Sequence, residues 1–229
     1  MKHTRLVAAL LASASLALAS IALAQDSAGA PKGDESSHKS KHKESKETKA
    51  VEVGAKVPDF TATDVDGKPV KFSDYAGKTV VLEWVNPDCP VCRKVTESGL
   101  VKKMIADAKA IDPSVVFLMV NSTAKMASKP AMTKDYLSSH GVNASAAIVD
   151  GDGTVGRLFG AKTTPHLFVV DAKGTLVYSG AIDDSADRGE TAGKTNYVIN
   201  ALTQLKAGQA VSPGSTKAYG CSVKYGKAG

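Results

Sequence analysis

The stretch TVVLEWVNPDCPVCRK, residues 79–94, decides the fold. Residues 79–86 form a nearly continuous apolar run, which is typical of a central strand buried on both faces of a sheet. Two cysteines follow in the spacing Cys-x-x-Cys, with Pro90 directly after Cys89. Because proline suits the first position of a helix, the pattern predicts a buried strand followed by a helix that opens at the cysteine pair.

The position of the two thiols favours redox chemistry. Residues three apart at a helix start are neighbours, so Cys89 and Cys92 can close a disulfide. Cys89 precedes the helix, where unpaired N–H groups and the helix dipole stabilise a thiolate, so we expect Cys89 to attack and Cys92 to resolve the mixed disulfide. A haem anchor needs histidine where Arg93 stands, and a zinc ribbon needs a second cysteine pair. A disulfide over so short a loop would constrain the unfolded chain little. We therefore predict no cofactor and no metal.

The first 24 residues have the pattern of a secretory signal peptide. Lys2 and Arg5 precede a long run of alanine, leucine and serine that ends in Ala22-Leu23-Ala24 before Gln25. We expect cleavage there rather than a membrane anchor, and no other stretch approaches the roughly 20 apolar residues of a membrane span. The mature protein is thus expected to be periplasmic or secreted, without a stable membrane span, in a compartment where disulfides persist.

Residues 25–50 predict a disordered linker. They are rich in lysine, serine and glutamate and contain no large apolar residue, so they cannot offset the entropy of ordering. Without Lys2 and Arg5, the chain has 27 basic and 23 acidic residues, a net charge of +4. This weak and dispersed charge argues against a nucleic-acid partner.

Residues 51–205 predict one α/β domain, and residues 206–229 form a tail that carries Cys221. A hairpin is expected around the Asp66-Gly67 turn, and a helix with one apolar face over 93–111. The further expected elements are a buried strand at 114–122, a helix at about 131–139, a short strand at 146–150, a short helix at 154–160, strands at 164–171 and 176–182, and a helix at 196–205. This order is that of a thioredoxin-like fold: a central mixed β-sheet flanked by helices, with an N-terminal β-hairpin extension.

Several segments resemble the redoxin branch of the thioredoxin superfamily, which peroxiredoxin-like and exported thioredoxin-like proteins share. These are residues 53–92, TTPHLFVVD at 163–171 and the YSGAIDD, NYVINAL and YGCSVKY segments, so the likeness covers residues 51–225. It implies an exported thiol-disulfide oxidoreductase whose partners are thiol or disulfide protein substrates, or small thiols, and an electron donor. It also implies that Pro165 is cis and that its neighbouring backbone lies against the disulfide and pairs with a substrate strand.

Two more residues are candidates for the site. Glu83 stands where thioredoxins place a buried acid, which could accept the Cys92 proton through water; the alternative is an outward side chain near a lysine. Cys221 is the odd cysteine, either a third redox thiol or an inert packed one. Many members of the similar exported group keep the tail cysteine and lack the second helix cysteine, so the partner of Cys89 stays open. We predict that Cys221 can pair with Cys89 as an internal substrate or relay.

Two other functions stay open as alternatives. A peroxiredoxin-like antioxidant peroxidase would have a hydroxyl residue and a proline where this chain has Asn86 and Leu82. A copper chaperone would bind Cu(I) through Cys89, Cys92 and a histidine, but such proteins usually have a wider cysteine spacing and no histidine is obviously placed. With Pro90 and Val91 between the cysteines, and no histidine there, the motif points to a reductant.

Overall fold

The computed structural model describes residues 49–185 and 193–227. The expected signal peptide, residues 1–24, and residues 25–48 of the expected linker lie outside them. Within these two ranges, no helix has the length and apolar character needed to cross a bilayer.

A seven-stranded mixed sheet forms the centre of the domain, in the order β2-β1-β5-β4-β3-β7-β8. β3 pairs in parallel with β4 and β4 with β5, whereas the β1–β2, β1–β5, β3–β7 and β7–β8 pairs are antiparallel. The strands are β1 (Thr61–Asp64), β2 (Pro69–Lys71), β3 (Val80–Trp84), β4 (Val116–Asn121), β5 (Ala146–Val149), β7 (Leu167–Val170) and β8 (Leu176–Gly180). The N-terminal hairpin β1–β2 therefore extends the same sheet.

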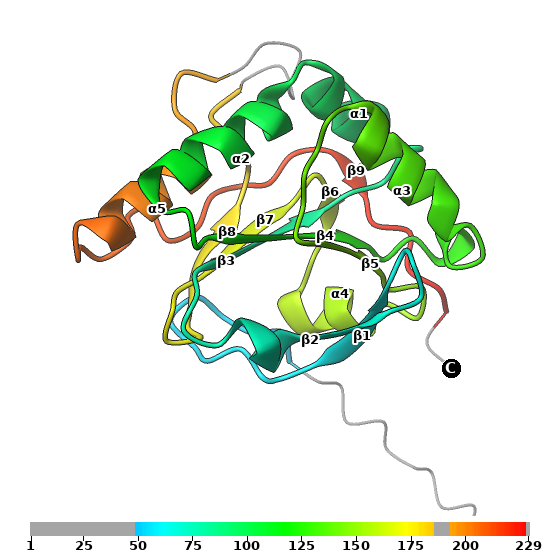
Figure 1. Cartoon of the computed structure of the whole chain (residues 1–229), viewed down its shortest axis with the longest axis horizontal. Coiled ribbons are helices and arrows are strands. Elements are labelled where there is room, and N and C mark those ends of the chain that lie inside the picture. Colours follow the sequence, from blue (N-terminus) through cyan, green and yellow to red (C-terminus); the bar gives the residue numbers. More distant parts are fainter. Residues whose placement is uncertain (1–48, 186–192, 228–229) are drawn as a thin grey trace, which may run out of the picture. The chain divides into compact units, whose positions relative to one another are not determined.

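Helices cover both faces of this sheet (Figure 1). α1 (Pro90–Glu97), α2 (Leu100–Ile111), α3 (Pro130–Ser139) and α5 (Tyr197–Lys206) lie on one face. α4 (Thr154–Phe159) lies on the other, and the 3-10 helices η1 (Phe72–Tyr75) and η2 (Ala124–Met126) sit in connections. The expected thioredoxin-like α/β architecture is confirmed.

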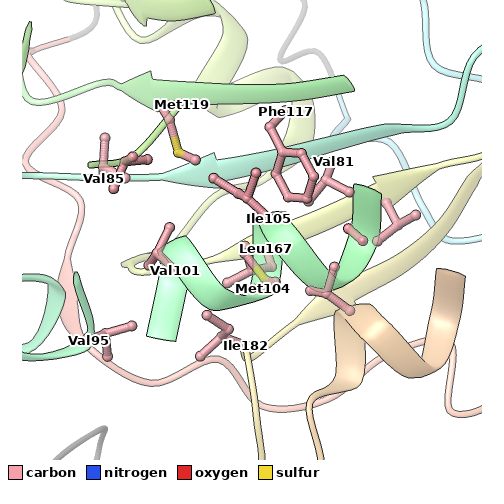
Figure 2. Close-up of a cluster of buried hydrophobic side chains, with 14 of the residues drawn as sticks. Val81, Val85, Val95, Val101, Met104, Ile105, Phe117, Met119, Leu167 and Ile182 are labelled. Atoms are coloured by element: carbon pink, nitrogen blue, oxygen red, sulfur yellow. The ribbon is translucent and has the colours of Figure 1, made fainter. Parts of the chain in front are cut away.

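Alternate residues of β3 contribute their side chains to two separate hydrophobic cores, one on each face of the sheet. Figure 2 shows Val81 of β3 in one cluster with Met104 and Ile105 of α2, and Val85, directly after β3, belongs to the same core. Leu82 and Trp84 instead pack in the core on the opposite face. Since successive side chains on a strand alternate between faces, Glu83 points to the face that carries α1.

The expected single helix over 93–111 is wrong, because the structure has two helices. α1 ends at Glu97, and Gly99 adopts a left-handed φ of 80° immediately before α2. Ser98 Oγ also donates to the Val95 carbonyl at 2.8 Å. Glycine reaches positive φ without steric penalty, so the chain can turn here although the apolar pattern continues across the break.

The expected strand 164–171 is likewise two strands. β6 (Thr163–Thr164) precedes the proline and β7 follows it, and the Thr164–Pro165 peptide bond is cis. Proline has no N–H to donate to a ladder, which separates the two strands. β6 pairs outside the central sheet, with β9 (Cys221–Ser222) of the tail.

Candidate active site at the start of α1

The loop between β3 and α1 presents Cys89 at the helix N-cap. Asn86 organises this loop, since its side-chain Oδ1 accepts from the Asp88 N–H at 2.9 Å and its carbonyl accepts from the Cys89 N–H at 3.0 Å. Pro90 occupies the first helical turn. The Cys89 sulfur accepts from the Cys92 N–H at 3.4 Å, so the nucleophile lies over the unpaired N–H groups of the helix start.

Cys89 is the more acidic thiol of the pair. It is only 1% exposed, and its sulfur lies 3.0 Å from the Thr164 carbonyl, a contact that favours the protonated form. Burial also opposes ionisation, but the Cys221 side chain and the backbone N–H groups of Cys92 and Cys221 outweigh it, and the pKa of Cys89 falls below its ordinary value. The helix position, the Cys221 side chain and the backbone N–H groups favour the thiolate, against burial and the Thr164 carbonyl contact.

The Cys92 thiol is held in its protonated form. It is fully buried, and its sulfur accepts from the Asn86 N–H at 3.5 Å. Burial, with the negative charge of Glu83 as the next cause, raises the pKa of Cys92 to about 12. The two thiols therefore differ strongly: one is prepared to attack, and the other keeps its proton until a base removes it.

Glu83 lies buried beneath this pair. The side chain is completely inaccessible to solvent, and neither carboxyl oxygen has a hydrogen-bond partner among the described residues. Burial raises the pKa of Glu83 to about 8. The alternative expectation of an outward side chain near a lysine is wrong, because β3 is central and both of its faces are covered.

Tyr136 of α3 contacts Cys92 and was not expected from the sequence. Its hydroxyl donates to the Cys92 carbonyl at 3.1 Å and lies 3.8 Å from the Cys92 sulfur. Burial raises the pKa of Tyr136, so the phenol stays protonated. The available signal was a tyrosine on the apolar face of a short helix, which alone does not identify its partner.

The loop that carries Pro165 lies against Cys89. Thr163 Oγ1 donates to the Pro165 carbonyl at 2.8 Å, and the Thr164 carbonyl makes the contact with Cys89. His166 follows the proline, and burial lowers its pKa to about 4. Its ring lies 4.3 Å from that of Phe168, so a neutral His166 packs in the core.

The tail places the third cysteine in the same site. Cys221 of β9 is paired with Thr164 of β6, and all three cysteines are free thiols in this structure. Cys89, Cys92, Glu83, Pro165 and Cys221, the five residues selected from the sequence, thus lie around the start of α1 and the adjoining loop. Among the described residues, no group of three or more histidine, cysteine or acidic side chains is arranged to hold a metal ion.

Known proteins are similar to this chain in sequence and fold. The redoxin family model matches residues 52–198. A thiol-disulfide oxidoreductase ResA of Bacillus cereus is 26% identical over 133 residues, which cover 58% of this chain and 71% of that protein.

Two solved structures have a similar fold. An uncharacterized conserved protein from Geobacillus kaustophilus superposes with a TM-score of 0.67 at 23% identity, covering 78% of this chain and 94% of that one. A hypothetical protein from Sinorhizobium meliloti has a TM-score of 0.66 at 21% identity, covering 78% and 97% of the two chains. The chain therefore belongs to the redoxin family and is an oxidoreductase of the thioredoxin-like class.

Proposed function

We propose that this chain is an exported thiol-disulfide oxidoreductase that exchanges the Cys89–Cys92 dithiol and disulfide with protein or small-thiol substrates. The observation that carries the proposal is the difference between the two thiols at the start of α1, with the pKa of Cys89 lowered and that of Cys92 raised to about 12. The ResA relatives, named as thiol-disulfide oxidoreductases, support it. Export to the periplasm or beyond is supported by the signal-peptide pattern of residues 1–24.

The first step is attack by the Cys89 thiolate on one sulfur of a substrate disulfide. The substrate S–S bond breaks, a Cys89–substrate disulfide forms, and the departing thiolate takes a proton from water. The N-cap position of Cys89 stabilises the thiolate before attack. The Pro165 loop, whose Thr164 carbonyl lies 3.0 Å from the Cys89 sulfur, provides a backbone edge for the substrate.

The second step releases the other half of the substrate. Cys92 attacks the Cys89 sulfur, the Cys89–Cys92 disulfide forms, and the second substrate thiolate departs. The Cys92 proton passes to Glu83, the buried carboxyl on the same face of β3 as α1. Tyr136 positions Cys92 through its hydrogen bond to the Cys92 carbonyl. Two electrons move from the dithiol to the substrate, and an external dithiol donor restores the enzyme.

The direction of physiological exchange is proposed to be reductive. Pro90 and Val91 separate the cysteines and add no cationic group that would further stabilise the Cys89 thiolate. Equilibration of the purified protein with reduced and oxidised glutathione gives the reduction potential. A value near those of strongly oxidising disulfide catalysts would contradict the assignment as a reductant.

Insulin reduction supplied with dithiothreitol tests the function. The chain from Gln25 onward should be active and Cys89→Ser inactive, and the double variant Cys92→Ser/Cys221→Ser, which has no second thiol to resolve the intermediate, should accumulate mixed disulfides with the substrate. Glu97→Gln is a matched control, because this residue lies on α1 with an exposed side chain paired to Arg93, and its activity should equal that of the parent. Full activity in Cys89→Ser would refute the dithiol mechanism.

A further inference from the structure

The tail strand β9 occupies a strand edge next to the nucleophile. Cys221 is paired with Thr164 and Ser222 with Thr163 in antiparallel register, and the Val223 N–H donates to the Lys162 carbonyl at 2.9 Å. Extended peptides that bind a sheet edge use the same main-chain hydrogen bonds. The tail therefore makes the interaction that an incoming protein segment would make with this edge.

The approach of the tail to this edge depends on Gly220. Its φ is +137°, and a Cβ added at this position would fall 2.2 Å from the Thr164 carbonyl oxygen. That is too close for any side chain, and the opposing atom is backbone that cannot rotate away. Glycine directly before the cysteine is thus what lets the two backbones meet.

Contacts on both sides of β9 hold the tail in place. The Tyr219 hydroxyl donates to Asp183 Oδ1 at 2.6 Å, and the Tyr225 hydroxyl donates to the Ala161 carbonyl at 2.7 Å. The Arg157 guanidinium lies 5.0 Å from the centre of the Tyr225 ring. Figure 1 shows the tail passing from α5 toward β6 and α1, so β9 reaches the site from the opposite end of the chain.

Cys221 lies next to Cys89, because it is paired with Thr164, whose carbonyl lies 3.0 Å from the Cys89 sulfur. Burial, followed by the Cys89 side chain and its charge, raises the pKa of Cys221, while the Cys221 side chain helps to lower the pKa of Cys89. Of these two thiols, Cys89 is therefore the more acidic. With the tail docked, Cys89 is only 1% exposed.

We propose that β9 is a substrate strand built into the chain. It occupies the strand edge that an extended segment of a protein substrate would bind, and it presents Cys221 to Cys89 in the place of the substrate's own cysteine. The inference rests on the proposed function of Cys89 and names its substrate class. A substrate must present an extended segment and displace the tail, and a small residue before its cysteine, like Gly220, lets it come as close to Thr164.

The exchange within the chain needs no external oxidant. When the Cys89–Cys92 disulfide is present, the Cys221 thiolate attacks the Cys89 sulfur. The Cys89–Cys92 bond breaks, the Cys89–Cys221 bond forms, and the Cys92 sulfur takes up one proton for the one that Cys221 released. One disulfide replaces another, so the number of electrons in the protein is unchanged.

The Cys89–Cys221 disulfide is tested in the Cys92→Ser variant of the chain from Gln25, oxidised with one equivalent of glutathione disulfide. Cys89 takes glutathione, and Cys221 then displaces it to give the intramolecular disulfide and a second reduced glutathione. Non-reducing tryptic mapping of the monomer should show peptide 79–93 joined to peptide 218–224. A stable glutathione adduct on Cys89 with free Cys221, or joined peptides only in dimers, overturns the proposal.

Occupancy of the edge is tested by Gly220→Val in the same Cys92→Ser background. Its Cβ would clash with Thr164, so alkylation of Cys89 by iodoacetamide should become at least about tenfold faster, equivalent to about 1.4 kcal/mol of docking free energy. Ser222→Val is the matched control, because Ser222 has an exposed side chain in the same strand. Removal of residues 218–229 is a second variant and should expose Cys89 at least as much. Equal rates in all of these proteins overturn the inference.

The two proposals fail in different ways. If Cys89→Ser retains full insulin reduction, the proposed function of the cysteine pair fails. If reduction requires Cys89 and Cys92 but no Cys89–Cys221 link forms and the tail variants do not expose Cys89, only the built-in substrate strand fails.

Discussion

Glu83→Gln is the substitution that most directly tests the buried acid of the site. Burial raises the pKa of Glu83 from 4.5 to about 8, so the folded chain keeps a proton that the unfolded chain releases over this interval. The free energy of unfolding should then fall by about 1.4 kcal/mol per pH unit on account of this group. The stability is greatest below pH 4.5 and is lost progressively as the pH rises to about 8.

The difference in the free energy of unfolding between Glu83→Gln and wild type isolates the contribution of this carboxyl group. Glutamine does not titrate, so the free energy of unfolding of Glu83→Gln minus that of wild type should rise by about 4 kcal/mol from pH 5 to pH 8. The glutamine amide also lacks partners, because neither oxygen of Glu83 has one among the described residues. This adds a constant cost of about 1–3 kcal/mol, so the slope with pH is diagnostic rather than the offset.

Urea unfolding of the reduced proteins at pH 5, 6, 7 and 8 gives these values from the midpoints and slopes. Glu97→Gln, which removes an exposed carboxyl of α1, should show no comparable pH-dependent difference. A Glu83→Gln difference that stays flat within about 1 kcal/mol would show that Glu83 titrates as an ordinary carboxyl, and its role as proton acceptor would be refuted. Turnover should agree, with the resolving step slowed about a hundredfold in Glu83→Gln and its rise toward pH 8 lost.

Three further outcomes are expected. Tyr136→Phe removes the hydroxyl that donates to the Cys92 carbonyl, so the free energy of unfolding in urea should fall by about 1 kcal/mol and mixed disulfides with the substrate should persist longer. If both values are unchanged, Tyr136 does not position Cys92. Hydrogen peroxide should oxidise Cys89 at the rate of an ordinary thiolate, since Asn86 stands where a peroxidase has a hydroxyl, and a stopped-flow rate typical of dedicated peroxidases would instead favour the antioxidant alternative. Gly99→Ala, at φ 80° with open space around it, should cost about 1 kcal/mol in thermal or urea unfolding, and a stabilised variant would contradict the observed break between α1 and α2.

The elements nearest the cysteine pair could be predicted because their signals are local. The apolar run at 79–86, the proline at the helix start and the threonine-proline pair at 164–165 each depend on neighbours in sequence. The burial of Glu83 was also available from the sequence. Apolar residues on both sides of it indicate a strand covered on both faces, and such a strand offers no outward position to an acid.

Other features depend on contacts between distant parts of the chain and could not be predicted. Tyr136 reaches Cys92 across 44 positions, and β9 joins β6 through only two paired residues. A two-residue strand has no periodicity to detect. The division at Gly99 was missed for a different reason, since an isolated glycine inside an apolar helical pattern is often tolerated, and only the backbone φ shows that the helix ends.

Because β9 is attached to its own enzyme, an external substrate needs a minimum affinity for the strand edge to compete with it. A short flexible tether holds its end at an effective concentration of about 1 mM, so a protein segment present at about 1 μM with equal intrinsic affinity would occupy the edge in only about one molecule in a thousand. The tail segment from Gly208 to Lys217 confines β9 at least as closely as such a tether would, because it is itself held to the domain: the Ser179 N–H donates to the Gly214 carbonyl and the Thr216 N–H to the Ser179 carbonyl, both at 3.1 Å. Tyr219 and Tyr225 add docking contacts. A productive substrate therefore has to bind the strand edge more tightly than β9 does, or bind elsewhere on the domain as well. On this reasoning the tail selects against incidental disulfides, and its removal should increase activity on small or generic disulfides more than on the true protein substrate.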